Sequence, residues 1–167
     1  MHRYRWYKFK IKYHLPMETN KEIISDLKDL LSIVNDGKEG YESSAEATEN
    51  IELQGVFLKY AAQRAAYAEE LRAHIKVHGA DAENESGGVL GALHRTWIDI
   101  KQALSSKEDQ AILEAVVTGE KAAIEKYDTY INDYLDHADH IELLKKQRDG
   151  VLEALKEVET LATTRSI

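Results

Sequence analysis

The sequence predicts an all-α protein, an up-down bundle of four long helices with one additional short helix. Apolar residues recur every three or four positions from Thr19 to about Leu161, which is the spacing of amphipathic helices. The one proline, Pro16, precedes this region, and no β-hairpin signal follows it. The 167 residues include no cysteine and no apolar run of the roughly 20 residues that span a membrane. Disulfide frameworks, cysteine-ligated metals and transmembrane helices are therefore excluded.

Five helical segments follow from this pattern. Their expected ranges are about 19–45, 51–78, 89–104, 107–134 and 138–161. Thr19 or Asn20 is expected to cap the first helix, and Ser106 the fourth, because short polar side chains accept hydrogen bonds from free N–H groups. Gly79 follows a basic last turn and is typical of a helix C-terminus. The first two segments are joined by a few polar residues, so they are expected to pack as antiparallel neighbours.

Two glycines interrupt the first helical segment. Gly37 and Gly40 are each about 1 kcal/mol less favourable in a helix than alanine would be. We therefore expect a bend or a close helix contact there.

Charge divides the chain into two regions. Residues 1–16 carry five lysines and arginines and no acidic residue, whereas the whole chain has a net charge of −8. We interpret residues 1–16 as a basic and aromatic N-terminal extension, disordered or non-native, and residues 17–167 as the helical domain. The acidic body disfavours nucleic acid. A nucleic-acid or membrane surface remains open as a ligand of residues 1–13 alone.

One arginine lies in the middle of an apolar stripe. Arg64 is almost on the centre line of the second helix, and a buried guanidinium requires carboxylate partners because it keeps its proton. Glu42, Glu46 and Glu120 are the candidates. Gln63, Gln147 and Arg148 also lie on or beside the stripes and complete a predicted buried polar network. In this interpretation the network fixes how the helices pack and binds no ligand.

The alternative interpretation is a metal site inside the bundle. Glu42, Glu46, His94 and Glu120 would be its ligands, and carboxylate and imidazole groups suit iron, manganese or zinc. Di-metal bundles carry a Glu-x-x-His pair on each of two helices, and the sequence contains none. An arginine near the centre would also repel a dication.

A second group of candidate ligands lies near the start of the fifth helix. Asp136, His137, Asp139 and His140 could bind zinc, but a solvated polar turn accounts for them more simply. His74 and His78, at the end of the second helix, are interpreted in the same way.

Four stretches carry a resemblance to a known family: DGKEGYESSAEA, LKYAAQRAAYAEEL, GGVLGALHRTWIDIKQAL and TGEKAAIEKYDTYI. They resemble an uncharacterised bacterial family, a domain of unknown function classed with the ferritin-like four-helix bundles, over about residues 19–162. The resemblance implies a ferritin-like fold and a bacterial, cytoplasmic setting, and no established activity.

Two functions are expected from these observations. The first is a non-enzymatic, ferritin-like bundle that acts as a stress-associated binding protein or assembles with itself as a dimer or higher homo-oligomer. The second is a metal-binding oxidase or metal-handling protein with iron, manganese or zinc. Nothing in the sequence identifies a catalytic residue.

Overall fold

In the part of the chain that the structure describes, five helices follow one another in the order that the periodicity predicts. The computed structural model describes residues 16–82, 93–134 and 138–165, with the side chains of residues 16–19 and 93–97 outside that description. The helices are α1 (Pro16–Ala47), α2 (Ile51–Val77), α3 (Leu93–Ser105), α4 (Asp109–Asp133) and α5 (Ala138–Arg165). The described residues contain no strand, so the predicted all-α class is confirmed.

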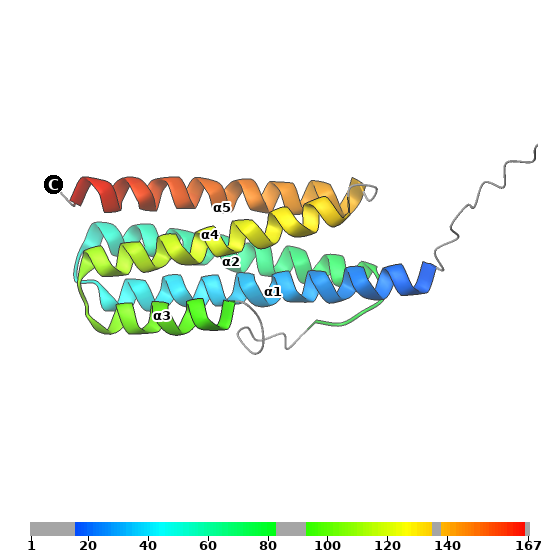
Figure 1. Cartoon of the computed structure of the whole chain (residues 1–167), viewed down its shortest axis with the longest axis horizontal. Helices are drawn as coiled ribbons and strands as arrows, with labels where there is room; N and C mark the ends of the chain where they lie inside the picture. Colours follow the sequence, from blue (N-terminus) through cyan, green and yellow to red (C-terminus); the bar gives the residue numbers. More distant parts are fainter. Residues whose placement is uncertain (1–15, 83–92, 135–137, 166–167) are drawn as a thin grey trace, which may run out of the picture.

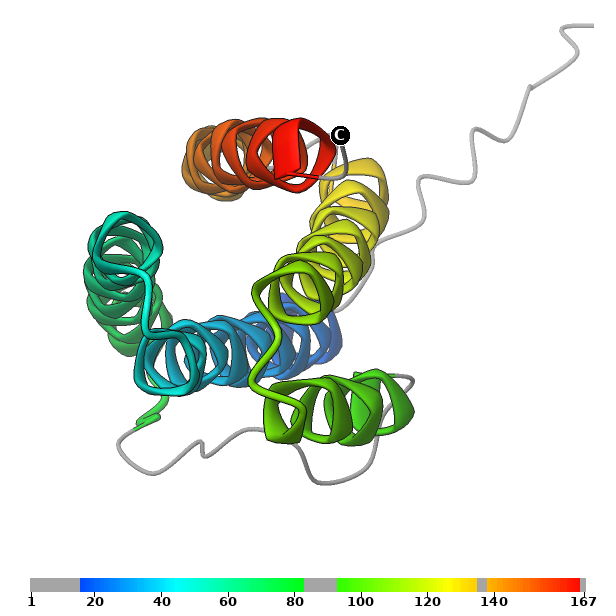
Figure 2. The same ribbon diagram turned by 90° about the vertical axis from the view of Figure 1, so that its left-hand side faces the viewer.

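The four long helices form two antiparallel pairs. α1 packs against α2 and α4 packs against α5, while α1 and α4 join the pairs (Figures 1 and 2). The short helix α3 lies outside this arrangement, against α1 and α4 (Figure 2). The predicted antiparallel packing of the first two helices is confirmed. None of the described helices combines the length and the apolar character needed to cross a membrane.

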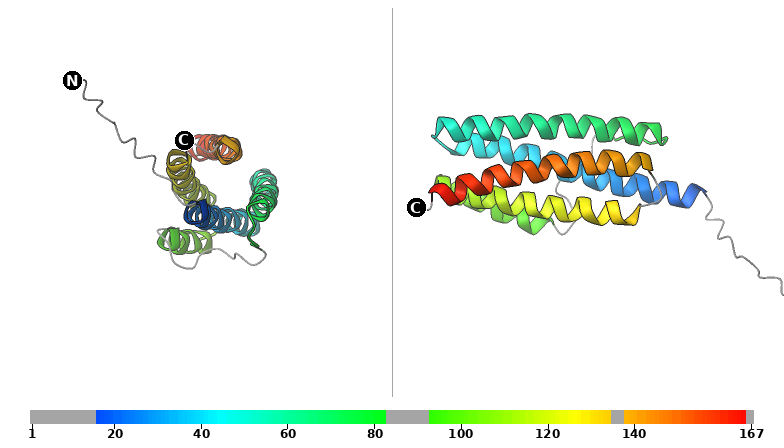
Figure 3. Two further views of the ribbon diagram at one scale, coloured as in Figure 1. Left: turned by 90° about the vertical axis from the view of Figure 1, so that its right-hand side faces the viewer. Right: turned by 90° about the horizontal axis from the view of Figure 1, so that it is seen from above.

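The arrangement brings particular helix ends together. α2 and α4 end, and α5 begins, at the end of the bundle where α1 starts (Figures 1 and 3). Residues that are far apart in sequence therefore become neighbours there.

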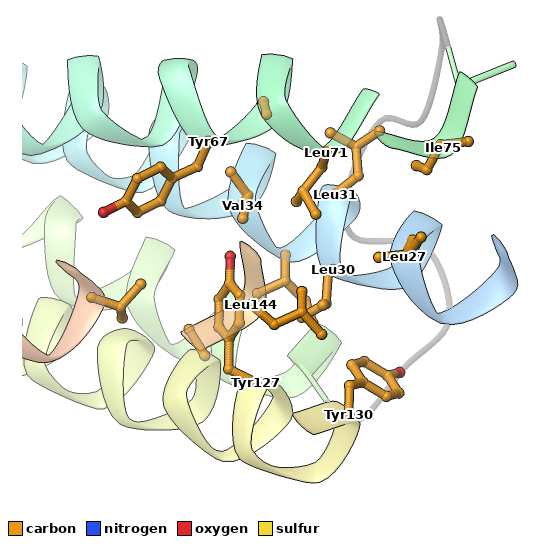
Figure 4. Close-up of a cluster of buried hydrophobic side chains, with 14 of the residues drawn as sticks. Leu27, Leu30, Leu31, Val34, Tyr67, Leu71, Ile75, Tyr127, Tyr130 and Leu144 are labelled. Carbon is orange, nitrogen blue, oxygen red and sulfur yellow. The ribbon is translucent and has the colours of Figure 1, made fainter. Parts of the chain in front are cut away.

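The core has two apolar clusters, one toward each end. One contains Leu30, Leu71 and Leu144, and Figure 4 shows it. The other contains Phe57 and Ile112. Along α2 and α4, Arg64 and Glu120 lie between the residues that belong to the two clusters. A charged layer thus separates the two apolar regions.

The predicted helix starts need two corrections. α1 begins at Pro16, and Asn20 does not cap it but donates from Nδ2 to the carbonyl of His78, 3.2 Å away. α4 has Glu108 at its N-cap without a capping side-chain bond. Ser106 instead donates to the Ala103 carbonyl and accepts from the Glu108 N–H at 3.3 Å, so it closes the turn before the helix.

The two glycines of α1 do not end the helix. α1 is continuous from Pro16 to Ala47, and a Cβ built on Gly37 would lie 3.5 Å from Nε of Arg64. The expected close contact is therefore present, and it brings α1 against the arginine of α2.

Candidate metal centre and central ion pair

The centre of the bundle holds a buried ion pair. Arg64 of α2 is 2% exposed and Glu120 of α4 is 4% exposed. Nη2 of the guanidinium donates to Oε2 of Glu120, and Nη1 donates to Oε1 of the neighbouring Gln63. The guanidinium carbon lies 5.7 Å from the ring centre of Tyr41 and 5.9 Å from that of Tyr67, within cation–π range.

The electrostatics of the pair explain why the two residues need each other. Burial raises the pKa of Glu120, and the adjacent Arg64 guanidinium opposes that rise. Burial also disfavours the charged form of Arg64, but the Glu120 carboxylate, together with Tyr41 and Tyr127, outweighs it and holds the pKa of Arg64 above its usual value. The pair satisfies itself internally and leaves no net charge to attract a cation.

A small cavity lies beside the pair. It has a volume of about 60 Å³, and its lining includes Ile33 and Asp36 of α1 and Ile100 of α3 as well as Arg64 and Glu120. Burial and the nearby Glu39 raise the pKa of Asp36 to about 6, although Lys101 lowers it. A carboxylate that faces a mostly apolar cavity is costly in its charged form.

The structure separates the other predicted carboxylates from Glu120. Glu42 lies on the surface of α1, where its Oε1 is 3.7 Å from Nζ of Lys38. Glu46 is exposed and lines a shallow groove with Gln54 of α2. His94 is in α3, with its side chain outside the described residues. The described members of this predicted metal-ligand set therefore do not converge.

Two of the three other predicted network residues are close to the bundle interior. Gln63 is half-buried against Arg64, and Gln147 is fully buried, where its Oε1 accepts from the Tyr127 hydroxyl at 2.7 Å. Arg148 differs from the prediction: its side chain is 30% exposed and pairs with Asp128 at 2.9 Å. Its long stem lets the charge reach the surface from a position next to the stripe.

A second cluster lies at the end of the bundle where α2 stops and α5 starts. In the described part of the chain, His74, His78, Asp139 and His140 bring one ligand atom each within 4.8 Å of one another. Nε2 of His78 is 3.5 Å from Oδ2 of Asp139, and Nε2 of His74 is 4.0 Å from the same oxygen. Nε2 of His74 and Nδ1 of His140 are 2.5 Å apart and share a hydrogen bond.

The end of α2 fixes its two histidines. His74 and His78 are four residues apart and so lie on one helix face. Gly79, at φ +86°, ends the helix: its N–H donates to the Lys76 carbonyl at 3.0 Å, and that of Ala80 donates to the Ile75 carbonyl at 3.3 Å. This pair of bonds is the Schellman motif, which only a left-handed residue completes, and it holds His78 at the C-cap.

The first turn of α5 supplies the other two candidate ligands. His140 is 2% exposed, and Asp139 beside it is exposed. The ring centres of the three histidines are 4.5–4.9 Å apart. Burial and the neighbouring His78 lower the pKa of His74, although Asp139 opposes this, so the neutral imidazole that a metal requires is favoured.

The donor set fits a transition-metal ion. Three imidazole nitrogens and one carboxylate oxygen suit zinc, which takes four such ligands at about 2.0–2.2 Å in a tetrahedron. That geometry places ligand atoms about 3.3–3.5 Å apart. The separation of His78 and Asp139 matches this already. The nitrogens of His74 and His140 would have to separate by about 1 Å from their hydrogen-bonded distance.

Most of the chain matches a known family. Residues 22–133 match the model of a domain of unknown function, DUF2383, which is more than half of the chain. The chain belongs to the DUF2383 family. No curated protein matches it.

The DUF2383 match covers only half of the histidine cluster. It includes the ion pair of Arg64 and Glu120 and the two histidines of α2, and it ends at Asp133, before Asp139 and His140 of α5. The candidate metal centre is thus formed where the matched DUF2383 region meets α5.

Sequence reasoning found only part of this cluster. Asp139 and His140 belong to the group that the sequence allows as zinc ligands but favours as a solvated turn, whereas Asp136 and His137 lie outside the described residues. His74 and His78 were interpreted as solvated helix ends. Their i, i+4 spacing was the available signal, but the partners on α5 are more than 60 residues away in sequence.

Proposed function

We propose that this DUF2383 protein is a metal-binding helical bundle that holds one divalent transition-metal ion, zinc in particular, between α2 and α5. The observation that supports this is the convergence of three histidines and one aspartate within 4.8 Å. Three imidazoles favour zinc over manganese, which prefers oxygen ligands, and iron is the competing ion that imidazole also suits.

The number of ligands supports a non-enzymatic role. Catalytic zinc sites keep three protein ligands and an open position, whereas four protein ligands close the coordination sphere. His74, His78, Asp139 and His140 supply four. A closed site stores, senses or stabilises and does not activate water. This proposal joins the non-enzymatic bundle and the metal-binding protein that the sequence left as alternatives.

A ferritin-like ancestry belongs to the same proposal. Ferritin-like di-metal proteins direct ligands inward from all four long helices. Here α2, α4 and α5 direct Arg64, Glu120 and Gln147 inward. The central position would then have exchanged a metal for an ion pair, and the remaining metal site lies at the end of the bundle.

Metal content tests the proposal. Protein purified without chelators is analysed for zinc, iron and manganese, and zinc affinity is measured by competition with a chromophoric chelator. We expect one zinc per chain and a loss of affinity of 10-fold or more in His74→Ala or Asp139→Ala. Glu46→Ala is the matched control and should bind as the wild type does. If Glu46→Ala loses its metal, or if His74→Ala and Asp139→Ala both keep theirs, the proposed site is wrong. The ion would then be assigned to the alternative ligands, which are Glu42, Glu46, His94 and Glu120.

Self-association is a second proposal. Ile51 and Leu58 of α2 are seven residues apart, so they lie on one face of the helix, and they are 83% and 55% exposed. Light scattering on the wild type and on a variant with Ile51→Glu and Leu58→Glu tests it. A dimer or higher assembly that the double substitution dissociates supports the proposal, and a monomeric wild type contradicts it.

A further inference from the structure

The contact between α2 and α5 is made by long side chains, because these two helices are not among the closely packed pairs. Its surface carries ion pairs: Nζ of Lys59 is 2.6 Å from Oε2 of Glu157, and Nζ of Lys146 is 2.8 Å from Oε1 of Glu70. Lys59 and Lys146 are more than half exposed. Exposed pairs of this kind stabilise a contact only weakly because water screens them.

The inner side of this contact has polar groups beside the apolar residues Leu71 and Leu144. Nε2 of Gln147 donates to the Tyr67 carbonyl at 3.2 Å and to Oε2 of Glu70 at 3.0 Å. Gly150 of α5 leaves the space that the Tyr67 side chain occupies, since a Cβ there would lie 1.8 Å from the Tyr67 hydroxyl oxygen. Hydrogen bonds that can be exchanged for water contribute little net stability. We call this contact, from Glu52–Arg165 to His74–His140, the α2–α5 seam.

The candidate metal centre closes one end of the seam. Two of its ligands, His74 and His78, come from α2, and the other two, Asp139 and His140, come from α5. An ion bound by all four has its full affinity only when the two helices are docked. Any opening that separates α2 from α5 at this end must break two metal bonds to one of them.

We infer that the bound ion acts as a clasp that controls opening of the α2–α5 seam, and so the access of solvent to the polar interior around Tyr67 and Gln147. This inference rests on the proposed metal-binding function and adds its regulation. The open population should fall by the factor 1 + [Zn²⁺]/Kd, which is about 1,000-fold when free zinc exceeds Kd 1,000 times.

Hydrogen exchange of the whole chain at buffered free zinc tests the clasp. We expect amides of α5 residues 146–158 to slow in proportion to free zinc, and in zinc-free protein to exchange faster than those of α1 residues 27–34. His78→Asn and Asp139→Asn should abolish the zinc dependence. Lys76→Ala, an exposed change on the last turn of α2, should retain it.

The experiment distinguishes a failure of the metal to control the α2–α5 seam from a failure of the chain to bind zinc. Calorimetry on the same samples reports whether zinc binds. If zinc binds at one per chain but protects only the last turn of α2 and the first turn of α5, the clasp is refuted and the metal site stands. If no zinc binds, both fail. His78→Asn is the safer of the two ligand variants because asparagine is accepted at a helix C-terminus, and circular dichroism checks that it folds.

Discussion

Replacing Arg64 by alanine should destabilise the protein strongly. Glu120 is 4% exposed, and its carboxylate would be left in the interior without its cation. Removing one partner of a buried pair costs about 3–5 kcal/mol. The lost side chain would also enlarge the cavity of about 60 Å³ that it lines. Urea denaturation at pH 7, followed by circular dichroism, measures the change in free energy of unfolding.

The pH dependence of this loss identifies its cause. Without Arg64, only burial acts strongly on Glu120 and its folded-state pKa rises further above the unfolded value. A raised carboxyl pKa contributes stability at low pH that is lost as pH rises through the folded pKa. The cost of Arg64→Ala should therefore be full near pH 8 and smaller near pH 4.5, where only the loss of packing remains.

A double variant separates charge from packing. Arg64→Met with Glu120→Leu removes both charges and keeps similar volume, so it should be as stable as the wild type or more stable by about 1–4 kcal/mol. Equal unfolding free energies for Arg64→Ala and the wild type, or a loss that does not change with pH, would refute the buried ion pair.

Two further predictions concern packing and charge elsewhere. Gly150→Ala should lower the free energy of unfolding by about 1–3 kcal/mol, because the new Cβ would overlap the Tyr67 hydroxyl. Gly55→Ala should raise it by about 0.5–1 kcal/mol, because nothing lies within 4 Å of the new Cβ. Thermal unfolding of both variants measures the two changes. Asp36→Asn should stabilise the protein by about 1 kcal/mol at pH 8 and by nothing near pH 4, because burial raises the pKa of Asp36 to about 6 and its contribution to stability is lost above that pH. A gain that is the same at both pH values would contradict the burial of that carboxyl.

The helices could be predicted because their information is local. The stripe that runs through Leu27, Leu30 and Leu31 defines α1 without knowledge of the rest of the chain, and those three residues are buried as it predicts. The predicted helix starts were less accurate than the helices themselves. Asn20 has the chemistry of a cap, but α1 begins at Pro16, so Asn20 lies inside the helix and its Nδ2 donates to the carbonyl of His78.

The candidate site depends on contacts that no local pattern records. Arg64 could be placed in the interior from its stripe, but three carboxylates were available to it. The approach of α4 to α2 selects Glu120. The histidine cluster needs the ends of α2 and α5 to meet, which only the helix arrangement decides.

The coordination of zinc in the purified protein tests the central claim most directly. X-ray absorption at the zinc edge counts imidazole ligands through their outer-shell scattering. We expect four nitrogen or oxygen ligands at about 2.0–2.2 Å, three of them imidazoles. A zinc ion bound by carboxylates and water alone, with no imidazole, would show that His74, His78 and His140 do not form the site.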